Sequence, residues 1–305
     1  MSERDSLFLG VDGGGTRCRA RLCNARGEML GEGVAGPANI RFGVAQSFDA
    51  VLEAARQCFQ KAGLAHDQLK NTTACLGLAG ATEPVYLAAA LSFRHPFRTI
   101  IITTDAQAAC AGAHGTDDGG IIIAGTGSIG WAQLGGHQHR VGGWGFPVSD
   151  EGSGAWLGCE ALRRVLWAHD GRLEWSPLLR TIFATFERDA HSIVRWMKMA
   201  TPRDFGRITH EIVEYAARGD PVGRELMVLS AGHIDTLAAR LRSLGVARIA
   251  LFGGLGGSIL PWLAPETREC FIEPKGDAVQ GALEIAIASE MAPARSHDAG
   301  LVTHG

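Results

Sequence analysis

Residues 12–16 read Asp-Gly-Gly-Gly-Thr and place a carboxylate, three glycines and a hydroxyl directly after the apolar run 7–11. From residue 17 to 22 polar and apolar side chains alternate, which predicts a second strand after the glycines. Backbone amides that no side chain obstructs can surround phosphate oxygens. Asp12 can hold a hydrated divalent cation, and Thr16 can donate its hydroxyl to a phosphate. The stretch is therefore predicted to be a phosphate-binding hairpin, with a simple tight turn as the alternative.

A second stretch of this kind begins at Gly125. The apolar run 120–124 leads into Gly125–Gly130, and a short apolar segment and a Gly-Gly turn follow. The spacing fits the dinucleotide fingerprint G-x-G-x-x-G, but that fingerprint requires a helix directly after the glycines. A Walker loop is excluded because the chain contains no Gly-Lys dipeptide. Two strand-loop-strand hairpins therefore indicate an internal duplication.

The hydrophobic periodicity predicts the same order of elements in both halves of the chain. In the first half we expect strands at 7–11, 17–23, 28–34, 73–78 and 99–103, and helices at about 47–62, from Glu83-Pro84, and at 106–113. In the second half we expect strands at 120–124, 129–134, 138–142, 248–252 and near 270–273, and helices from Ala155, near 258–263 and at about 277–291. A mostly helical insertion is predicted between about 170 and 244. It contains Thr201-Pro202 and Asp220-Pro221, each typical of an N-cap followed by proline at the first helical position.

Six motifs occur in a fixed order along the chain. They are Asp12–Thr16, Thr104-Asp105-Ala106, Gly125-Thr126-Gly127-Ser128, Gly142-Gly143-Trp144-Gly145, Asp150-Glu151-Gly152-Ser153 and Phe252–Gly257. Together with the two βββαβαβ units, these motifs resemble the actin, hexokinase and Hsp70 ATPase superfamily. Within it the chain is most similar to the N-acetylglucosamine kinase branch, which is grouped with the BadF/BadG-type ATPases. The resemblance covers about residues 6–291.

The resemblance implies an α/β fold of two duplicated ribonuclease H-like (actin-like ATPase) domains, forming two lobes with an interdomain cleft. One lobe is expected to contain residues 1–117 plus about 277–305, with the first hairpin and a returning C-terminal helix. The other lobe is expected to contain residues 118–276, with the second hairpin, the helical insertion and the adenosine motif.

The family resemblance also implies an ATP-dependent amino-sugar kinase that uses Mg²⁺ and phosphorylates the 6-hydroxyl of N-acetylglucosamine. Such a transfer needs in-line positioning, charge neutralisation and a base near the hydroxyl. Asp105 is the expected base, because it follows the apolar strand 99–103 and so lies at a carboxyl end, where ligands gather in open α/β sheets. The alternative is that Asp105 is only the N-cap of the helix that follows.

The expected ligand-binding residues follow from the family motifs. The residues assigned to ATP are Gly13, Gly14, Gly15, Thr16, Gly125, Thr126, Gly127, Ser128, Gly254 and Gly256, and Asp12 is assigned to the metal. The residues assigned to the sugar are Asn39, Asp105, Gly142, Gly143, Trp144 and Asp150. Two alternatives remain open. Asp150-Glu151 can form a capping box before the helix at Ala155, and Trp144 can be a core aromatic packed between glycines.

Two other functions remain as alternatives. Mammalian-type N-acetylglucosamine kinases carry a tryptophan shortly after the asparagine, whereas Asn39 is followed by Ile-Arg-Phe-Gly. Glucosamine is therefore a rival substrate on the same scaffold. An ATPase that activates a redox enzyme would need paired cysteine ligands for an iron–sulfur cluster in each subunit. Cys110 lies in a plausible region for one ligand, but Gly152 occupies the second expected position.

Composition limits the remaining function classes. A chain of 305 residues with 46% hydrophobic side chains can bury two cores. The net charge of −3 argues against nucleic acid as the main partner. Seven cysteines without a C-x-x-C pair favour free thiols in a reducing compartment. With a charged start and no apolar run of about 18 residues, we expect neither a signal peptide nor a membrane span. The protein is predicted to be a cytoplasmic homodimer.

Overall fold

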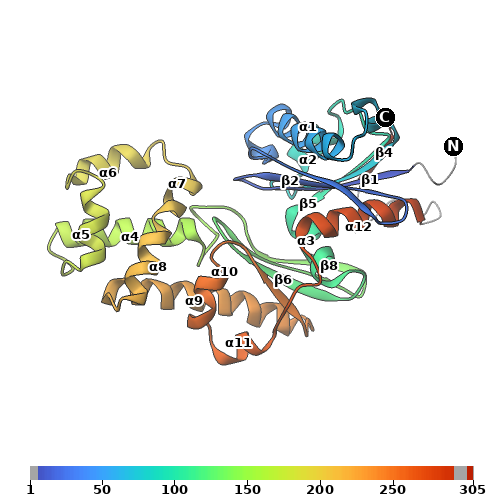
Figure 1. Ribbon diagram of the computed structural model, residues 1–305. Helices are drawn as coiled ribbons and strands as arrows, with labels where there is room; N and C mark the ends of the chain where they lie inside the picture. Colours follow the sequence, from blue (N-terminus) through green and yellow to red (C-terminus); the bar gives the residue numbers. More distant parts are fainter. Residues whose placement is uncertain (1–5, 292–300, 305) are drawn as a thin grey trace. The chain divides into compact units, whose positions relative to one another are not determined.

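The computed structural model describes residues 6–291 and 301–304. The chain divides into two compact units, Met1–Asp117 with Pro274–Gly305, and Asp118–Glu273. Both are built from a mixed sheet and helices (Figure 1), so the predicted α/β class is confirmed. Among the described residues, no helix is both long enough and apolar enough to cross a membrane.

The first unit is built on a six-stranded sheet with the order β11-β5-β4-β1-β2-β3. The strands β1 (Leu7–Gly13), β2 (Cys18–Asn24) and β3 (Met29–Ala35) form an antiparallel meander. The strands β4 (Thr72–Leu78) and β5 (Thr99–Thr104) continue the sheet in parallel, and β11 (Leu301–His304) pairs antiparallel with β5. The sequence did not predict β11.

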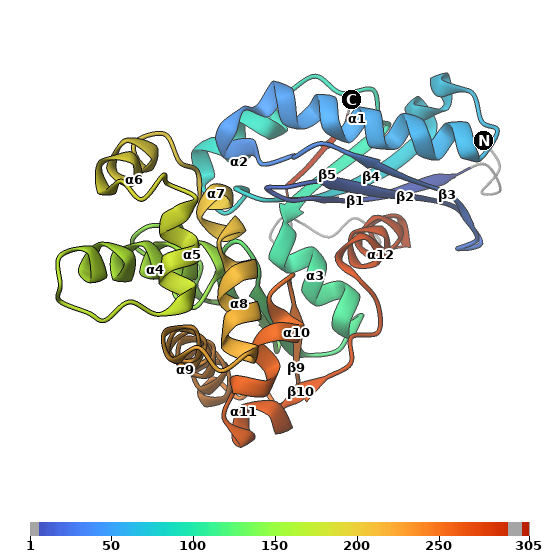
Figure 2. The same ribbon diagram turned by 60° about the vertical axis from the view of Figure 1, so that its left-hand side comes forward.

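Helices cover both faces of this sheet (Figure 2). The helices α1 (Val44–Lys61) and α2 (Pro84–Leu91), with the short η2 (Ile40–Phe42) and η3 (His66–Asn71), belong to one side. The helices α3 (Asp105–His114) and α12 (Ala278–Met291) cover the other. Along β1, Leu9 and Val11 face the α1 side while Phe8 faces α12, because successive strand residues point to opposite faces.

Glycines allow α1 to approach the sheet closely. A β-carbon on Gly33 would lie 2.0 Å from the carbonyl oxygen of Ala54 in α1. This contact is far shorter than packed atoms tolerate. The position therefore requires glycine.

The second unit repeats the sheet of the first. Its order is β10-β9-β6-β7-β8, which matches β5-β4-β1-β2-β3. The strands β6 (Gly119–Ala124), β7 (Ser128–Leu134) and β8 (His137–Gly142) form the antiparallel meander, and β9 (Ile249–Phe252) and β10 (Phe271–Ile272) add in parallel. The repeated order agrees with an internal duplication.

The helices of the second unit include the predicted insertion. The full set is α4 (Gly154–His169), α5 (Pro177–Ala184), α6 (Ala190–Met197), α7 (Pro202–Arg207), α8 (Thr209–Ala217), α9 (Pro221–Ser243), α10 (Gly256–Ile259), η4 (Leu260–Trp262) and α11 (Pro265–Glu269). Both predicted N-caps are confirmed. Thr201 forms a capping box with Asp204 at α7, and Asp220 accepts hydrogen bonds from the amides of Val222 and Gly223 at α9.

Candidate active site

The predicted site residues of the first unit lie at one edge of its sheet. Asp12 is the penultimate residue of β1, and Asp105 follows β5 directly. Asn39 forms a parallel bridge with Ala79, the residue after β4. Because the ends of β1, β4 and β5 are in register, these three side chains originate from the same carboxyl edge. That edge is where ligands bind in open α/β sheets.

The first glycine hairpin combines a packed base with an exposed tip. A β-carbon on Gly13 would lie 2.6 Å from the Leu78 side chain, so this glycine allows tight packing. The amide of Gly14 donates to the carbonyl oxygen of Arg17 at 3.0 Å and closes the turn. Gly15 and Thr16 are exposed, and a β-carbon on Gly15 would meet no atom within 4 Å. The tip therefore leaves room for a ligand beside its backbone.

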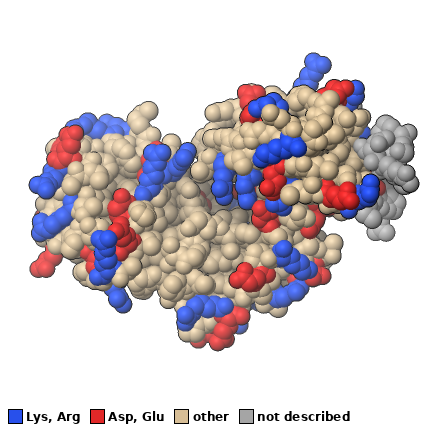
Figure 3. Space-filling model, in the orientation of Figure 1, with Lys and Arg blue, Asp and Glu red and all other residues tan. Residues whose placement is uncertain are grey.

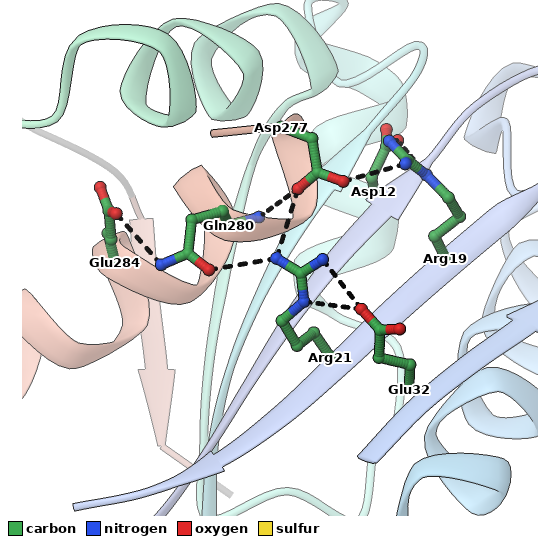
Figure 4. A network of polar contacts seen from close by, with 7 residues as sticks. All are labelled: Asp12, Arg19, Arg21, Glu32, Asp277, Gln280 and Glu284. Carbon is green, nitrogen blue, oxygen red and sulfur yellow. Dashed lines mark hydrogen bonds and ion pairs between the residues drawn. The ribbon is translucent and has the colours of Figure 1, made fainter. Parts of the chain in front are cut away.

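Asp12 does not stand alone at the mouth of this hairpin. Arg19, directly opposite it in β2, donates from Nε and Nη2 to Oδ2 of Asp12 at 3.2 and 2.7 Å. Nη1 of Arg19 donates to Oδ2 of Asp277 at 3.0 Å (Figure 4). Neither Arg19 nor Asp277 belongs to the motifs that predicted site residues. The β-hairpin register could have placed Arg19 opposite Asp12, but Asp277 is 258 residues from Arg19.

A cation at Asp12 would need ligands from outside the protein. Among the described residues, no group of three or more His, Cys, Asp and Glu side chains could hold a metal ion. Mg²⁺ is usually bound by one or two carboxylates together with water and substrate phosphates. The single carboxylate of Asp12 beside the glycine hairpin fits that type of site.

Asp105 is not the N-cap of the helix that it begins. Thr104 holds that position, and its hydroxyl accepts a hydrogen bond from the Gln107 amide at 3.0 Å. Asp105 is the first residue of α3, and its Oδ1 accepts from the amide of Ala106 at 2.9 Å. The capping alternative for Asp105 is therefore wrong, because the threonine before it supplies the cap.

Asn39 caps a single turn of 3₁₀ helix. Its Oδ1 accepts a hydrogen bond from the Arg41 amide at 3.0 Å. Phe42, three residues on, is 72% exposed, and Arg41 pairs with Glu83 at 3.2 Å. The carboxamide NH₂ group of Asn39 is a donor that its capping bond does not use.

In the second unit, the structure brings the second glycine hairpin together with the predicted adenosine motif. The β6–β7 hairpin closes through a bond from the Gly125 amide to the Gly127 carbonyl at 2.9 Å. A β-carbon on Gly253, which follows β9, would lie 2.2 Å from the carbonyl oxygen of Ala124. Gly254 and Gly256 belong to this same turn into α10. All these residues lie at the carboxyl ends of two parallel strands, β6 and β9.

The same hairpin is tied to the start of α4. The amides of Gly154 and Ala155 donate to the carbonyl oxygens of Gly125 and Thr126 at 2.8 and 3.1 Å. Ser128 donates its hydroxyl to the Glu151 carbonyl at 2.7 Å. The hairpin is therefore fixed by hydrogen bonds to the first two residues of α4 and to Glu151, which lies just before that helix.

Arg140 organises the loop that contains Gly142, Gly143 and Trp144. Its guanidinium donates from Nε to the Gly142 carbonyl at 3.0 Å and from Nη2 to the Gly143 carbonyl. It also stacks on the Trp144 ring, with 3.9 Å to the ring centroid. Trp144 is 73% exposed, so the alternative of a core aromatic is wrong. Arg140 lies outside the sequence motifs and was not among the predicted site residues.

Asp150 lies between this loop and the second hairpin. Its Oδ1 accepts from the Gly145 amide at 3.2 Å, and a β-carbon on Gly127 would lie 2.7 Å from its Oδ2. Burial raises the pKa of the Asp150 carboxyl above its usual value, while bonds from the Gly145 and Phe146 amides act in the opposite direction. The N-cap of α4 is Ser153, which accepts from the Trp156 amide. The capping alternative for Asp150 is therefore wrong.

Charged side chains of both signs are interspersed over the face drawn in Figure 3, in agreement with the small net charge of −3.

Comparisons with known proteins extend these observations. A family model described as the BadF/BadG/BcrA/BcrD ATPase family matches residues 9–286. The chain is 41% identical over 281 residues to the glucosamine kinase GspK of Vibrio cholerae serotype O1, covering 92% of this chain and 96% of that protein. It is 28% identical over 227 residues to an N-acetylmuramic acid/N-acetylglucosamine kinase of Clostridium acetobutylicum, covering 72% of this chain and 74% of that protein.

Solved structures give the same picture. A Chromobacterium violaceum protein assigned as an N-acetylglucosamine kinase aligns with a TM-score of 0.87 at 35% identity, covering 92% of this chain and 99% of that chain. A ROK family glucokinase from Streptomyces griseus, solved with glucose and AMPPNP, aligns with a TM-score of 0.53 at 20% identity, covering 94% of this chain and 100% of that chain. These likenesses confirm the predicted family resemblance and the predicted fold.

Proposed function

This chain belongs to the BadF/BadG/BcrA/BcrD ATPase family, and we propose that it transfers the γ-phosphoryl group of ATP to the 6-hydroxyl of an amino-hexose. The observation that carries the proposal is the alignment of Asp12, Asn39 and Asp105 along one carboxyl edge of the first sheet. A metal carboxylate, a sugar hydrogen-bonding amide and a base are the groups that a sugar kinase needs there.

Glucosamine is the acceptor that we favour, with N-acetylglucosamine second. The support is the 41% identity to a glucosamine kinase over nearly the full length of both proteins. The segment after Asn39 also lacks the tryptophan of mammalian-type N-acetylglucosamine kinases and presents the exposed Phe42 instead. A free amine is cationic at neutral pH, and the carboxylates of Asp150 and Glu151 are suitable partners for it.

Asp105 acts as the general base in this proposal. Its carboxylate takes the proton of the sugar 6-hydroxyl while the hydroxyl oxygen attacks the γ-phosphorus in line with the leaving ADP. The bond between the γ-phosphorus and the bridging oxygen breaks, and the products are the sugar 6-phosphate and ADP. The position of Asp105 at the start of α3 supports this role, since Thr104 already serves as the cap.

Each of the two glycine hairpins is suited to binding nucleotide phosphates. The backbone of Gly13, Gly14, Gly15 and Thr16 and that of Gly125, Thr126, Gly127 and Ser128 supply hydrogen-bond donors, and Gly254 and Gly256 let the backbone approach the adenosine. Asp12 would be the residue that holds Mg²⁺. When bound, the cation neutralises phosphate charge that develops during the transfer.

The homodimer and the cytoplasmic location remain predictions.

The sugar lies against polar loop groups. In the first unit, Asn39 offers the donor of its carboxamide to the sugar, and in the second unit the loop of Gly142, Gly143 and Trp144 is assigned to sugar contacts. Asp150 accepts from vicinal hydroxyls, because a carboxylate can serve two of them at once. The assignment of this loop to the sugar is supported by its fixed conformation, since Arg140 donates hydrogen bonds to two of its carbonyl groups.

A redox-activator function has less support. Cys110 is 2% exposed, and Gly152 occupies the position of the second ligand. Four thiolates from two subunits would be needed for a cluster of the expected kind. An amino-sugar kinase needs no cysteine ligands of this kind.

A coupled assay of ADP release tests the proposed function. Purified protein with Mg²⁺ and ATP is given glucosamine, N-acetylglucosamine, N-acetylmannosamine or glucose in separate reactions. We expect ADP release to depend on the sugar, with the largest kcat/KM for glucosamine. ATP hydrolysis at one rate with and without every sugar would refute the kinase assignment.

A further inference from the structure

A chain of ion pairs connects the candidate metal carboxylate to the last helix of the first unit. Arg19 lies between Asp12 and Asp277 and donates to both, at 2.7 Å from Nη2 and at 3.0 Å from Nη1 (Figure 4). Their side chains are 29%, 20% and 34% exposed, so solvent screens these pairs only in part. The proposed phosphoryl transfer does not itself use Arg19 or Asp277.

Arg19 engages only one oxygen of Asp12. Both of its hydrogen bonds to this carboxylate end on Oδ2. Since a guanidinium is a rigid planar fork, two bonds to one oxygen fix the direction of the carboxylate. Oδ1 is left for another ligand, and Arg19 thereby determines where that ligand can sit.

Asp277 in turn fixes Arg19. It directly precedes α12, and its Oδ1 accepts from the Gln280 amide at 2.9 Å, as an N-cap carboxylate does. The helix behind it is closely packed, because a β-carbon on Gly281 would lie 2.0 Å from the Ala108 carbonyl of α3. Asp277 therefore holds Arg19 from a rigid support.

Asp277 also sets the net charge at the site. The pair of Asp12 and Arg19 is neutral by itself and would attract a cation weakly. Asp277 also pairs with Arg21 at 3.5 Å, and Arg21 pairs with Glu32 at 2.8 Å, so the five groups together carry one net negative charge, which favours a divalent cation. Partners of this kind behind a ligand typically change metal affinity 10–100-fold.

We propose that Arg19 and Asp277 are positioning residues for the metal–nucleotide site. Arg19 directs Oδ1 of Asp12 toward the cation, and Asp277 holds Arg19 in place and restores the negative charge. This inference rests on the proposed role of Asp12 as the metal carboxylate.

Two variants separate these roles because they change the charge in opposite directions. Asp277→Asn keeps the size and the capping oxygen but removes the charge, so the dissociation constant of Mn²⁺ in the presence of ADP should rise roughly 10-fold. Arg19→Gln removes the positive charge, so Mn²⁺ affinity should not fall, but kcat should drop because the direction of Asp12 is lost. A purely structural role would weaken both variants in the same way.

Electron paramagnetic resonance of free Mn²⁺, titrated with protein and ADP, gives the metal dissociation constant without any turnover. Metal-free ADP binding and sugar binding, measured by calorimetry, should stay unchanged in both variants. The matched control is Asp67→Asn, which removes an exposed carboxylate charge of the first unit that pairs with Lys70 and leaves Arg19 with both of its carboxylates. It should behave as the unmodified protein.

Three results would overturn the inference. These are an unchanged Mn²⁺ dissociation constant in Asp277→Asn, a loss of Mn²⁺ affinity in Arg19→Gln as well, and weaker metal-free ADP binding in Arg19→Gln, which would make Arg19 a phosphate ligand. Asp12→Asn identifies a failure of the premise. If Asp12→Asn binds Mn²⁺ and ADP normally, the metal role of Asp12 is refuted. If Mn²⁺ affinity is lost in Asp12→Asn but in neither of the other two variants, only the positioning roles are refuted.

Discussion

Replacing Asp105 by asparagine should separate the chemistry of this position from its role in the fold. Asn has nearly the same size as Asp and keeps an oxygen that can accept the Ala106 amide bond. It cannot take a proton from a sugar hydroxyl. We therefore expect a folded protein with a large loss of kcat.

The expected sizes of the two effects differ clearly. Loss of a positioned base lowers kcat by about 10²–10⁴, which corresponds to about 3–5 kcal/mol of activation free energy. Loss of a negative charge from the first turn of α3 should lower the free energy of unfolding by only about 0.3–1 kcal/mol. The N-cap itself stays intact because Thr104 provides it.

The matched control is Thr104→Ala, one residue earlier. This change removes the cap bond to the Gln107 amide and should lower the free energy of unfolding by about 1 kcal/mol. Its kcat should fall much less than that of Asp105→Asn. Steady-state kinetics at saturating ATP and sugar, with urea unfolding of both variants, gives the four values. Near-normal kcat in Asp105→Asn would refute the assignment of Asp105 as the base.

Three further predictions follow from packing, burial and titration. Gly33→Ala should lower the free energy of unfolding by about 3 kcal/mol, because the added β-carbon would lie 2.0 Å from a carbonyl oxygen of α1. The control is Gly36→Ala, since a β-carbon at Gly36 would meet no atom within 4 Å. Equal urea midpoints for the two variants would contradict the close packing at Gly33. Since burial raises the pKa of Asp150, the folded state holds this proton more tightly than the unfolded state, and stability from this group is lost as pH rises above about 4. The free energy of unfolding of the protein minus that of Asp150→Asn should therefore fall as pH rises above that value, and then level off. A difference that does not change with pH would contradict this prediction. A thiol reagent should label Cys159 and Cys270, which are half-buried, before the five buried cysteines, and mass spectrometry of the labelled native protein would reveal any other order.

Much of the fold follows from local sequence signals. Apolar runs that end in glycine clusters mark β1 and β6, and the strand alternation after them marks β2 and β7. The two proline-linked N-caps in the helical insertion were predicted for the same reason, since their chemistry is local. Such signals need no knowledge of distant residues.

The helix caps at Thr104 and Ser153 show where local signals become ambiguous. In each motif an aspartate and a hydroxyl residue stand close together, and both types cap helices well. From the sequence, Asp105 and Asp150 were alternative caps, but in the structure the hydroxyl residues Thr104 and Ser153 are the N-caps. Neither aspartate is therefore the N-cap of the helix that follows it.

The family resemblance implied that the C-terminal helix returns to the first lobe, but the individual side-chain contacts that it makes there could not be predicted. Asp277 reaches Arg19 across 258 residues, because α12 returns to the sheet of the first unit. Arg140 was missed for another reason. Its hydrogen bonds go to backbone carbonyls of the Gly142–Trp144 loop, and these groups carry no sequence signature.

Identification of the product of glucosamine and ATP tests the central claim most directly. The reaction is run to completion with Mg²⁺, and the product is analysed by phosphorus and proton nuclear magnetic resonance. We expect ADP and a sugar phosphate whose phosphorus couples to the two protons on carbon 6. Inorganic phosphate without a sugar phosphate, or phosphorus coupled to a proton of a ring carbon, would contradict it.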